Sequence, residues 1–206
     1  MNDKSSRRVT IAYSDFKTLD QINEELGIVI NEADKIYGNI EPVEVSQWFT
    51  DTMKRTYTKA VTIGTEVARQ ALIVDQVLIE LEGHVPISFF LGTTFNVDSS
   101  KGLTGAPDAL ISKSDNQLYI TSPVIVLVEA KKGDLGEALP QCIAEMEAAR
   151  IFNEHKNNGI PTVYGAVTNG ELWQFMNLTD NTATVDLCSY NFGDGGKIIG
   201  ILKSFV

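Results

Sequence analysis

One short run constrains the fold more than any other stretch of the sequence. Val124 to Val128 are five consecutive apolar residues, mostly β-branched, and the run ends at Glu129. A proline before it and a glycine soon after it bound a strand that is covered on both faces. Since side chains alternate along a strand, Glu129 and Lys131 are predicted to lie on the same face. A carboxylate beside an ammonium group at the end of a core strand indicates a chemical role.

A second carboxylate completes this pattern upstream. Asp108 directly follows Pro107, and twenty residues separate it from Glu129. Carboxylate oxygens are the hard ligands that Mg²⁺ takes, with water completing its shell. Lys131 could orient an attacking water or stabilise negative charge on a phosphate. A Pro-Asp pair alone more often begins a turn, so the prediction depends on the combination.

The combination resembles a known motif. Pro107-Asp108 followed by Glu129-Ala130-Lys131 is similar to the motif of the PD-(D/E)xK nuclease superfamily. Gln141, ten residues after Lys131, resembles the glutamine that follows the motif in RecB-type nuclease domains and in the N-terminal domain of type I restriction motor subunits. Residues 164–175 resemble the strand, turn and strand that close the sheet in the latter group. The resemblance covers roughly residues 63 to 178.

The resemblance implies an α/β fold with a restriction-endonuclease-like core, in which helices flank a central mixed β-sheet. We expect residues 63–206 to form this nuclease domain. Residues 1–62 are expected to be a small N-terminal extension of a strand and helices, for which the sequence predicts no role.

The resemblance also implies a Mg²⁺-dependent nuclease that hydrolyses phosphodiester bonds of DNA, with Mn²⁺ able to substitute. Asp108, Glu129 and Glu66 are then expected to be metal ligands. Lys131 is expected to activate or orient the attacking water, and Gln141 to support the site. The alternative is a catalytically silent member of the same fold that acts as an interaction or regulatory module.

Glu66 enters the prediction through a helix expected from about Ile63 to Leu81. At helical spacing this segment has an apolar seam that includes Val67, Ala71, Val74 and Leu78. Glu66 falls inside the apolar arc, where a carboxylate is costly unless it is paired or coordinated. It occupies the place of the family's helix glutamate, and Glu80 is the second candidate. The alternative is that Glu66 only complements the helix dipole.

The rest of the chain alternates between helical and strand patterns. Gln141 and Glu145 share a face of small residues, which predicts close packing over the sheet. Trp48 and Tyr57 are predicted to pack into the core, with a docking surface as the alternative. The other expected elements are a strand at 9–13, a helix at 18–26, a strand at 28–30, a helix at 43–60, strands at 86–98 and from 109, a helix at 135–156 regular from about Glu137, strands at 162–167, 172–178 and 182–190, and a helix at 197–205.

The charge balance is the main objection to a nuclease. The net charge is -10 with a pI near 4.7, whereas proteins that bind nucleic acid alone usually carry a basic surface. Two local basic groups are candidates for such a surface: Lys54, Arg55 and Lys59, and Lys131 with Lys132. We therefore expect weak DNA binding by the isolated chain, and a protein partner in a DNA-processing complex or a second copy of the chain as further partners.

The sequence also bears on location. No apolar run approaches the ~18 residues that a membrane span needs, and no signal peptide is recognisable. A cytoplasmic protein without a membrane partner is expected. Cys142 and Cys188 have neither metal-site nor disulfide spacing and are expected to be core thiols.

Overall fold

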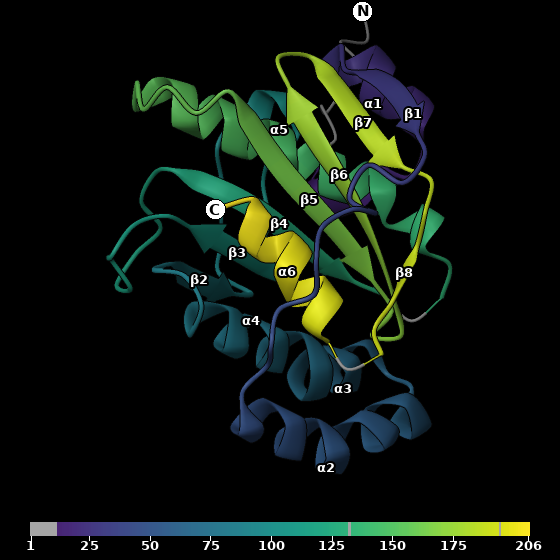
Figure 1. The fold of residues 1–206 in the computed structure, drawn as a ribbon. Coiled ribbons are helices and arrows are strands. Elements are labelled where there is room, and N and C mark those ends of the chain that lie inside the picture. The colour runs from purple at the N-terminus through teal and green to yellow at the C-terminus, as the bar shows by residue number, and fades with distance from the viewer. Residues whose placement is uncertain (1–11, 132, 194) are drawn as a thin grey trace, which may run out of the picture.

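The computed structural model describes residues 12–131, 133–193 and 195–206, and within them every side chain except that of Leu127. The described strands form one eight-stranded mixed sheet in the order β1-β7-β6-β5-β4-β3-β2, with β8 beside β6 (Figure 1). The predicted α/β class with a central mixed sheet is therefore confirmed. The strands are β1 Val29–Ala33, β2 Ser88–Leu91, β3 Ala109–Ser112, β4 Val124–Ala130, β5 Thr162–Thr168, β6 Leu172–Thr179, β7 Thr182–Asp186 and β8 Tyr190–Asn191.

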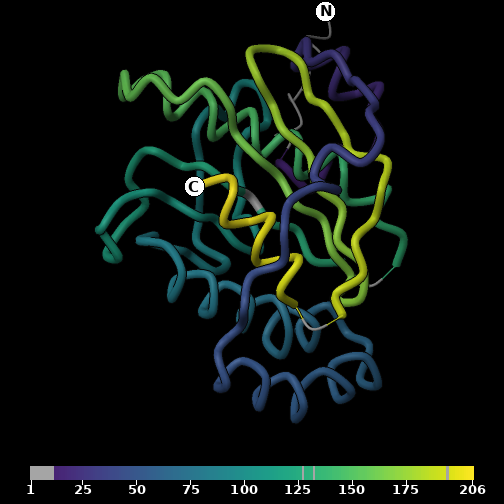
Figure 2. Tube along the Cα trace, in the orientation of Figure 1, coloured from purple at the N-terminus to yellow at the C-terminus, as the bar shows by residue number. Residues whose placement is uncertain are grey.

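Helices cover both faces of this sheet (Figures 1 and 2). One face carries α1 and α5, and the other carries α4 and α6, while α2 packs outside α3 and α4. β4 pairs parallel to β5 and antiparallel to β3, which places its end between two strands and near both helical layers. The helices are α1 Leu19–Leu26, α2 Gln47–Ile63, α3 Glu66–Arg69, a π-helical turn Gln70–Val74, α4 Asp75–Glu82, α5 Leu139–His155 and α6 Gly196–Ser204.

The core lies on both faces of β4, as its uninterrupted apolar run predicts. Val124 packs into the cluster beneath α5, whereas Val126 and Val128 pack into the cluster beneath α4 and α6. All three side chains are fully buried. Burial on both faces explains why this strand lacks the alternation of a half-exposed strand.

Close packing fixes α5 over the sheet. A Cβ atom at Gly165 of β5 would lie 2.5 Å from the sulfur of Met146 and 3.0 Å from that of Cys142. Only glycine allows α5 to approach this closely, which confirms the packing predicted from the small-residue face. The helix begins later than predicted, at Leu139, because a 3₁₀ turn over Leu135–Glu137 precedes it.

The N-terminal region is built onto the same sheet. β1 pairs parallel to β7 and supplies one edge. α1 begins with a capping box of Thr18 and Gln21, and Gly27, whose φ is 70°, follows its last residue. The predicted strand at 9–13 falls mostly outside the described residues, and Tyr13 lies in a 3₁₀ turn. The division at residue 62 stays a prediction, but residues 12–62 share the sheet and the core clusters with the rest.

Asp186 joins the segment after β1 to the end of β7. Its buried carboxylate accepts hydrogen bonds from the backbone N–H groups of Lys35, Tyr37 and Cys188 and from the hydroxyl of Tyr190. The bond from Cys188 turns the chain, so β7 ends at Asp186 and the predicted strand to residue 190 is wrong in its second half. Cys188 is half-buried, and only Cys142 is a core thiol.

The predicted strand at 86–98 is also too long. β2 ends at Leu91 because Gly92 turns the chain with a φ of 53°. Phe95 is buried, but its backbone N–H donates to the carbonyl of Gly105 in a loop. Its apolar character therefore comes from core packing outside a strand. No helix among the described residues is long and apolar enough to cross a membrane.

Candidate active site

The hairpin of β3 and β4 brings Asp108 to Glu129. Ala109 of β3 pairs with Val128 of β4, so the residue before β3 lies beside the residue after Val128. The backbone N–H of Asp108 donates to Glu129 Oε1 at 3.4 Å, and the backbone N–H of Ala130 donates to Asp108 Oδ2 at 2.8 Å. The twenty residues between Asp108 and Glu129 therefore form a hairpin that brings the two residues into contact.

Lys131 and Gln141 complete the cluster. Lys131 Nζ lies 3.4 Å from Glu129 Oε2, as expected for two residues on one face of a strand. The same ammonium donates to Gln141 Oε1 at 3.4 Å, and Gln141 lies in the first turn of α5. The backbone N–H of Lys131 donates to the carbonyl of Thr168 in β5. Four of the five predicted site residues are therefore linked by direct contacts, while their roles stay predictions.

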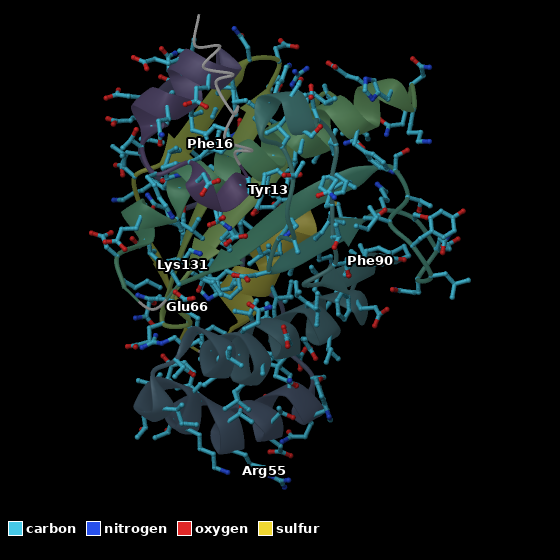
Figure 3. The ribbon with its side chains drawn as sticks, turned by 180° about the vertical axis from the view of Figure 1, so that it is seen from behind. Tyr13, Phe16, Arg55, Glu66, Phe90 and Lys131 are labelled. Carbon is cyan, nitrogen blue, oxygen red and sulfur yellow. The ribbon has the colours of Figure 1, made fainter. Side chains whose placement is uncertain are left out.

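Glu66 lies near this cluster, but for a reason different from the predicted one. It is exposed and begins α3, and Val67 beside it is 78% exposed, so the predicted apolar arc is wrong. The helix expected from Ile63 is interrupted by Gly64 and by the π-helical turn, which together rotate the buried face. Glu66 nevertheless lines a cavity of about 320 Å³ together with Asp108. Figure 3 shows Glu66 and Lys131 at the same end of the sheet.

Glu80, the second candidate, has a structural role elsewhere. It accepts hydrogen bonds at 2.6 and 2.7 Å from the backbone N–H and hydroxyl of Ser46, the N-cap of α2. Burial raises the pKa of Glu80, but the bonds from Ser46 outweigh it and the pKa is lowered. Glu80 therefore joins α4 to the start of α2.

Sequence reasoning missed Asp75 in the same cavity. Asp75 begins α4, lines the cavity with Glu66 and Asp108, and accepts a hydrogen bond from Gln70 Nε2 at 2.7 Å. Burial raises the pKa of Asp75, and the negative charge of Asp108 adds to this effect. The sequence signal for Asp75 was its spacing of five residues from Gln70. Residues five apart meet on a π-helical turn, whereas on an α-helix residues three or four apart meet.

Sequence reasoning also assigned no role to Glu145. It is fully buried one turn after Gln141, whose Nε2 donates to Glu145 Oε1 at 3.2 Å. Burial raises the pKa of Glu145 well above its ordinary value, and the adjacent charge of Glu129 raises it further. Among the described residues, Oε2 of Glu145 accepts no hydrogen bond, and Oε2 of Glu129 has only the ammonium of Lys131 beside it, at 3.4 Å. The signal for this pair was present in the polar stripe of α5.

Among the described residues, the charge at the site comes mainly from carboxylates around the ammonium of Lys131. Burial raises the pKa of Asp108 despite the opposing effects of the Ala130 N–H and Lys131. Burial also raises the pKa of Glu129, and the charge of Asp108 acts in the same direction. For Lys131, burial alone would lower the pKa, but the charges of Glu129 and Asp108 outweigh it and the pKa is raised. Lys131 is therefore held as a cation.

The carboxylates fit a divalent cation that keeps much of its water. No three His, Cys, Asp or Glu side chains in the described ranges are grouped so as to hold a metal by themselves. Mg²⁺ is usually bound by only one or two carboxylates with water and phosphate oxygens completing its shell. Asp108 and Glu129 supply such a pair, and Glu129 Oε2, which accepts no hydrogen bond from a described residue, faces the ammonium of Lys131 at 3.4 Å.

Comparison with known proteins found no relative of this chain among the family models and curated proteins searched. The chemistry of the site must therefore be argued from its own residues. These are the buried Glu129, the half-buried Asp108, a cation and an amide at the end of β4, with Glu66 and Asp75 lining the adjoining cavity.

Proposed function

We propose that this chain is a Mg²⁺-dependent nuclease of the restriction-endonuclease-like class that hydrolyses phosphodiester bonds of DNA. The observation that carries the proposal is the junction at the end of β4, where Asp108, Glu129, Lys131 and Gln141 contact one another. Glu129 lies near the end of β4, Asp108 and Lys131 lie directly before β3 and after β4, and Gln141 lies in α5. A cation and two carboxylates in a half-buried position suit the transfer of a charged phosphoryl group.

Asp108 and Glu129 would hold the cation, which would supply positive charge to stabilise the phosphate during the reaction. Glu66 and Asp75 lie across the cavity and add negative charge that favours a cation there. Gln141 holds the ammonium of Lys131 in position through its Oε1. The amide therefore positions a charged group and does not itself react.

The charge state of Lys131 decides its role. A protonated amine cannot accept a proton from water, so Lys131 is proposed to donate hydrogen bonds to the attacking water or to a phosphate oxygen. In the reaction, a water oxygen forms a bond to phosphorus while the bond to the leaving sugar oxygen breaks. The water releases a proton to solvent, and the leaving oxygen takes one up.

A cleavage assay with the purified chain tests the proposal. The substrates are single-stranded, duplex and supercoiled DNA and RNA, at low salt with Mg²⁺ or Mn²⁺. We expect cleavage by the wild type and its loss in Lys131→Ala with Mg²⁺ binding retained, because Lys131 is not a ligand. Asp108→Ala should lose both cleavage and Mg²⁺ binding by calorimetric titration. Lys203→Ala removes an exposed lysine on α6 and is the matched control.

Two results would contradict the proposal. Cleavage that persists undiminished in both site variants would identify a contaminating enzyme. Equal Mg²⁺ binding by wild type and Asp108→Ala would remove the metal site from this position. Absence of cleavage together with intact Mg²⁺ binding would favour the silent interaction module, and a pull-down from the native host would then identify its partner.

A further inference from the structure

A second cavity lies between α2 and the loop after β8, away from the carboxylates. Its volume is about 320 Å³, at the lower end of the size of ligand pockets. Tyr57 and Phe192 form its aromatic wall, with ring centroids 5.3 Å apart and planes 12° from parallel. The remaining lining residues are Thr50, Met53, Lys54, Thr58 and Gly193. A planar group of one or two rings fits a cavity with this wall.

The helix that carries the cavity is basic in an acidic protein. The net charge of α2 is +2, because it carries three basic residues, Lys54, Arg55 and Lys59, and one acidic residue, Asp51. The net charge of the whole chain is -10. All three basic side chains are exposed. Lys54 contacts Asp51 at 3.4 Å, but both are largely exposed, and such a pair contributes little. Figure 3 shows Arg55 at the outer surface of α2.

The cavity is connected to the site at the end of β4. The backbone N–H of Phe192 donates to the carbonyl of Glu171, in the turn between β5 and β6. At the other end of that turn, the carbonyl of Thr168 accepts the backbone N–H of Lys131. α2 itself ends at Ile63, about 9 Å along its axis from Tyr57. Three residues after Ile63, Glu66 lines the first cavity, the one that Asp108 also lines.

We propose that this second cavity binds one base of a single-stranded DNA segment, whose phosphates lie on Lys54, Arg55 and Lys59. The ring of Tyr57 supplies a stacking surface, which accepts any base because every base has an aromatic face. Single-stranded DNA is the occupant because a base can enter such a cavity only when it is unpaired. The inference rests on the proposed function, since it gives an acidic nuclease a basic surface for its substrate.

The test measures binding without cleavage. Full-length protein in EDTA is titrated into a short fluorescein-labelled oligothymidylate, and anisotropy is recorded between ~20 and ~200 mM NaCl. Tyr57→Leu keeps an apolar side chain but removes the ring, and should weaken binding about 5- to 100-fold, the contribution of one stacked base. The triple variant Lys54→Ala/Arg55→Ala/Lys59→Ala should lower the slope of log affinity against log salt by about 2.

A charge-matched control separates position from net charge. Lys101→Ala/Lys156→Ala/Lys203→Ala removes three exposed lysines from other surfaces and should bind almost as wild type does. Circular dichroism and melting temperatures check that each variant folds. The inference would be overturned if both triple variants lost the same affinity, or if Tyr57→Leu bound as tightly as wild type. It would also be overturned if the wild type bound the oligothymidylate no more tightly than a duplex.

The two proposals fail in different ways. Cleavage that depends on Lys131 but not on the α2 variants would overturn this inference and leave the nuclease proposal intact. Binding in EDTA that depends on Tyr57 and the basic residues, without cleavage on any substrate, would support the binding site and count against the nuclease.

Discussion

Replacing the buried Glu145 by glutamine should stabilise the protein at alkaline pH. Glu145 is fully buried beside Glu129, and the two carboxyl groups are within hydrogen-bonding reach of each other. A carboxyl group with a raised folded-state pKa binds its proton more tightly in the folded protein. Its contribution to stability is therefore greatest at low pH and falls as pH rises through the folded-state pKa. Glu145→Gln removes this dependence.

The expected size follows from the new hydrogen bond. At pH 8 the introduced amide can donate to the carboxylate of Glu129, and a hydrogen bond to a charged group contributes about 1.5–3 kcal/mol. For a chain of this length, that corresponds to a rise in melting temperature of roughly 3–12 °C. Near pH 5 the proton on Glu145 makes the same bond, so the difference should vanish.

The assay is urea denaturation of wild type and Glu145→Gln from pH 5 to pH 9. Glu147→Gln, two residues along α5, is the control. Glu147 accepts two hydrogen bonds from Arg150, at 2.7 and 2.8 Å, so its replacement should lower stability at pH 8. Wild type and Glu145→Gln of equal stability at pH 8, or a variant less stable at every pH, would refute the reasoning.

Three further predictions concern packing, the Asp186 junction and metal binding. Gly165→Ala should cost about 1–3 kcal/mol in urea denaturation, because the new methyl group meets Met146; an unchanged midpoint would show that α5 can move. Asp186→Ala leaves four donors without their acceptor and should cost at least about 3 kcal/mol by the same measurement; a loss below about 1 kcal/mol would show that water replaces the carboxylate. Mg²⁺ at 100 times its Kd should stabilise the wild type by about 2.7 kcal/mol, seen as a rise in melting temperature, and Asp108→Asn should abolish the rise; an equal rise in the variant would place the cation elsewhere.

Some strands of the sheet could be predicted from the sequence, whereas the bounds of others could not. β4 was predictable because an uninterrupted apolar run bounded by proline and glycine has few other structures. The connection between β5 and β6 contains the pair Asn169-Gly170, which favours a hairpin, and Gly170 has a φ of 85°. β2 was overextended because Phe95 is as apolar as a strand residue but packs from a loop. Periodicity reports burial and not the backbone conformation that produces it.

The site was predicted in part for the same reason. The face shared by Glu129 and Lys131 follows from strand geometry alone, and the structure places them in contact. The π-helical turn before Asp75 shifts every later side chain around the helix, and a calculation at ~100° per residue does not include it. Glu66 was therefore given the wrong environment, and Asp75 was overlooked.

The parallel pairing of β1 with β7 sets an order for folding during synthesis. The backbone N–H of Lys35 meets the carboxylate of Asp186 across 151 residues of chain. At ~5–20 residues per second, a ribosome needs roughly 8–30 s to add that much chain. Until then Ile22 and Ile28, both fully buried in the finished protein, have no completed sheet to pack against. Residues 19–35 therefore wait for their packing partners until the last quarter of the printed sequence has been synthesised.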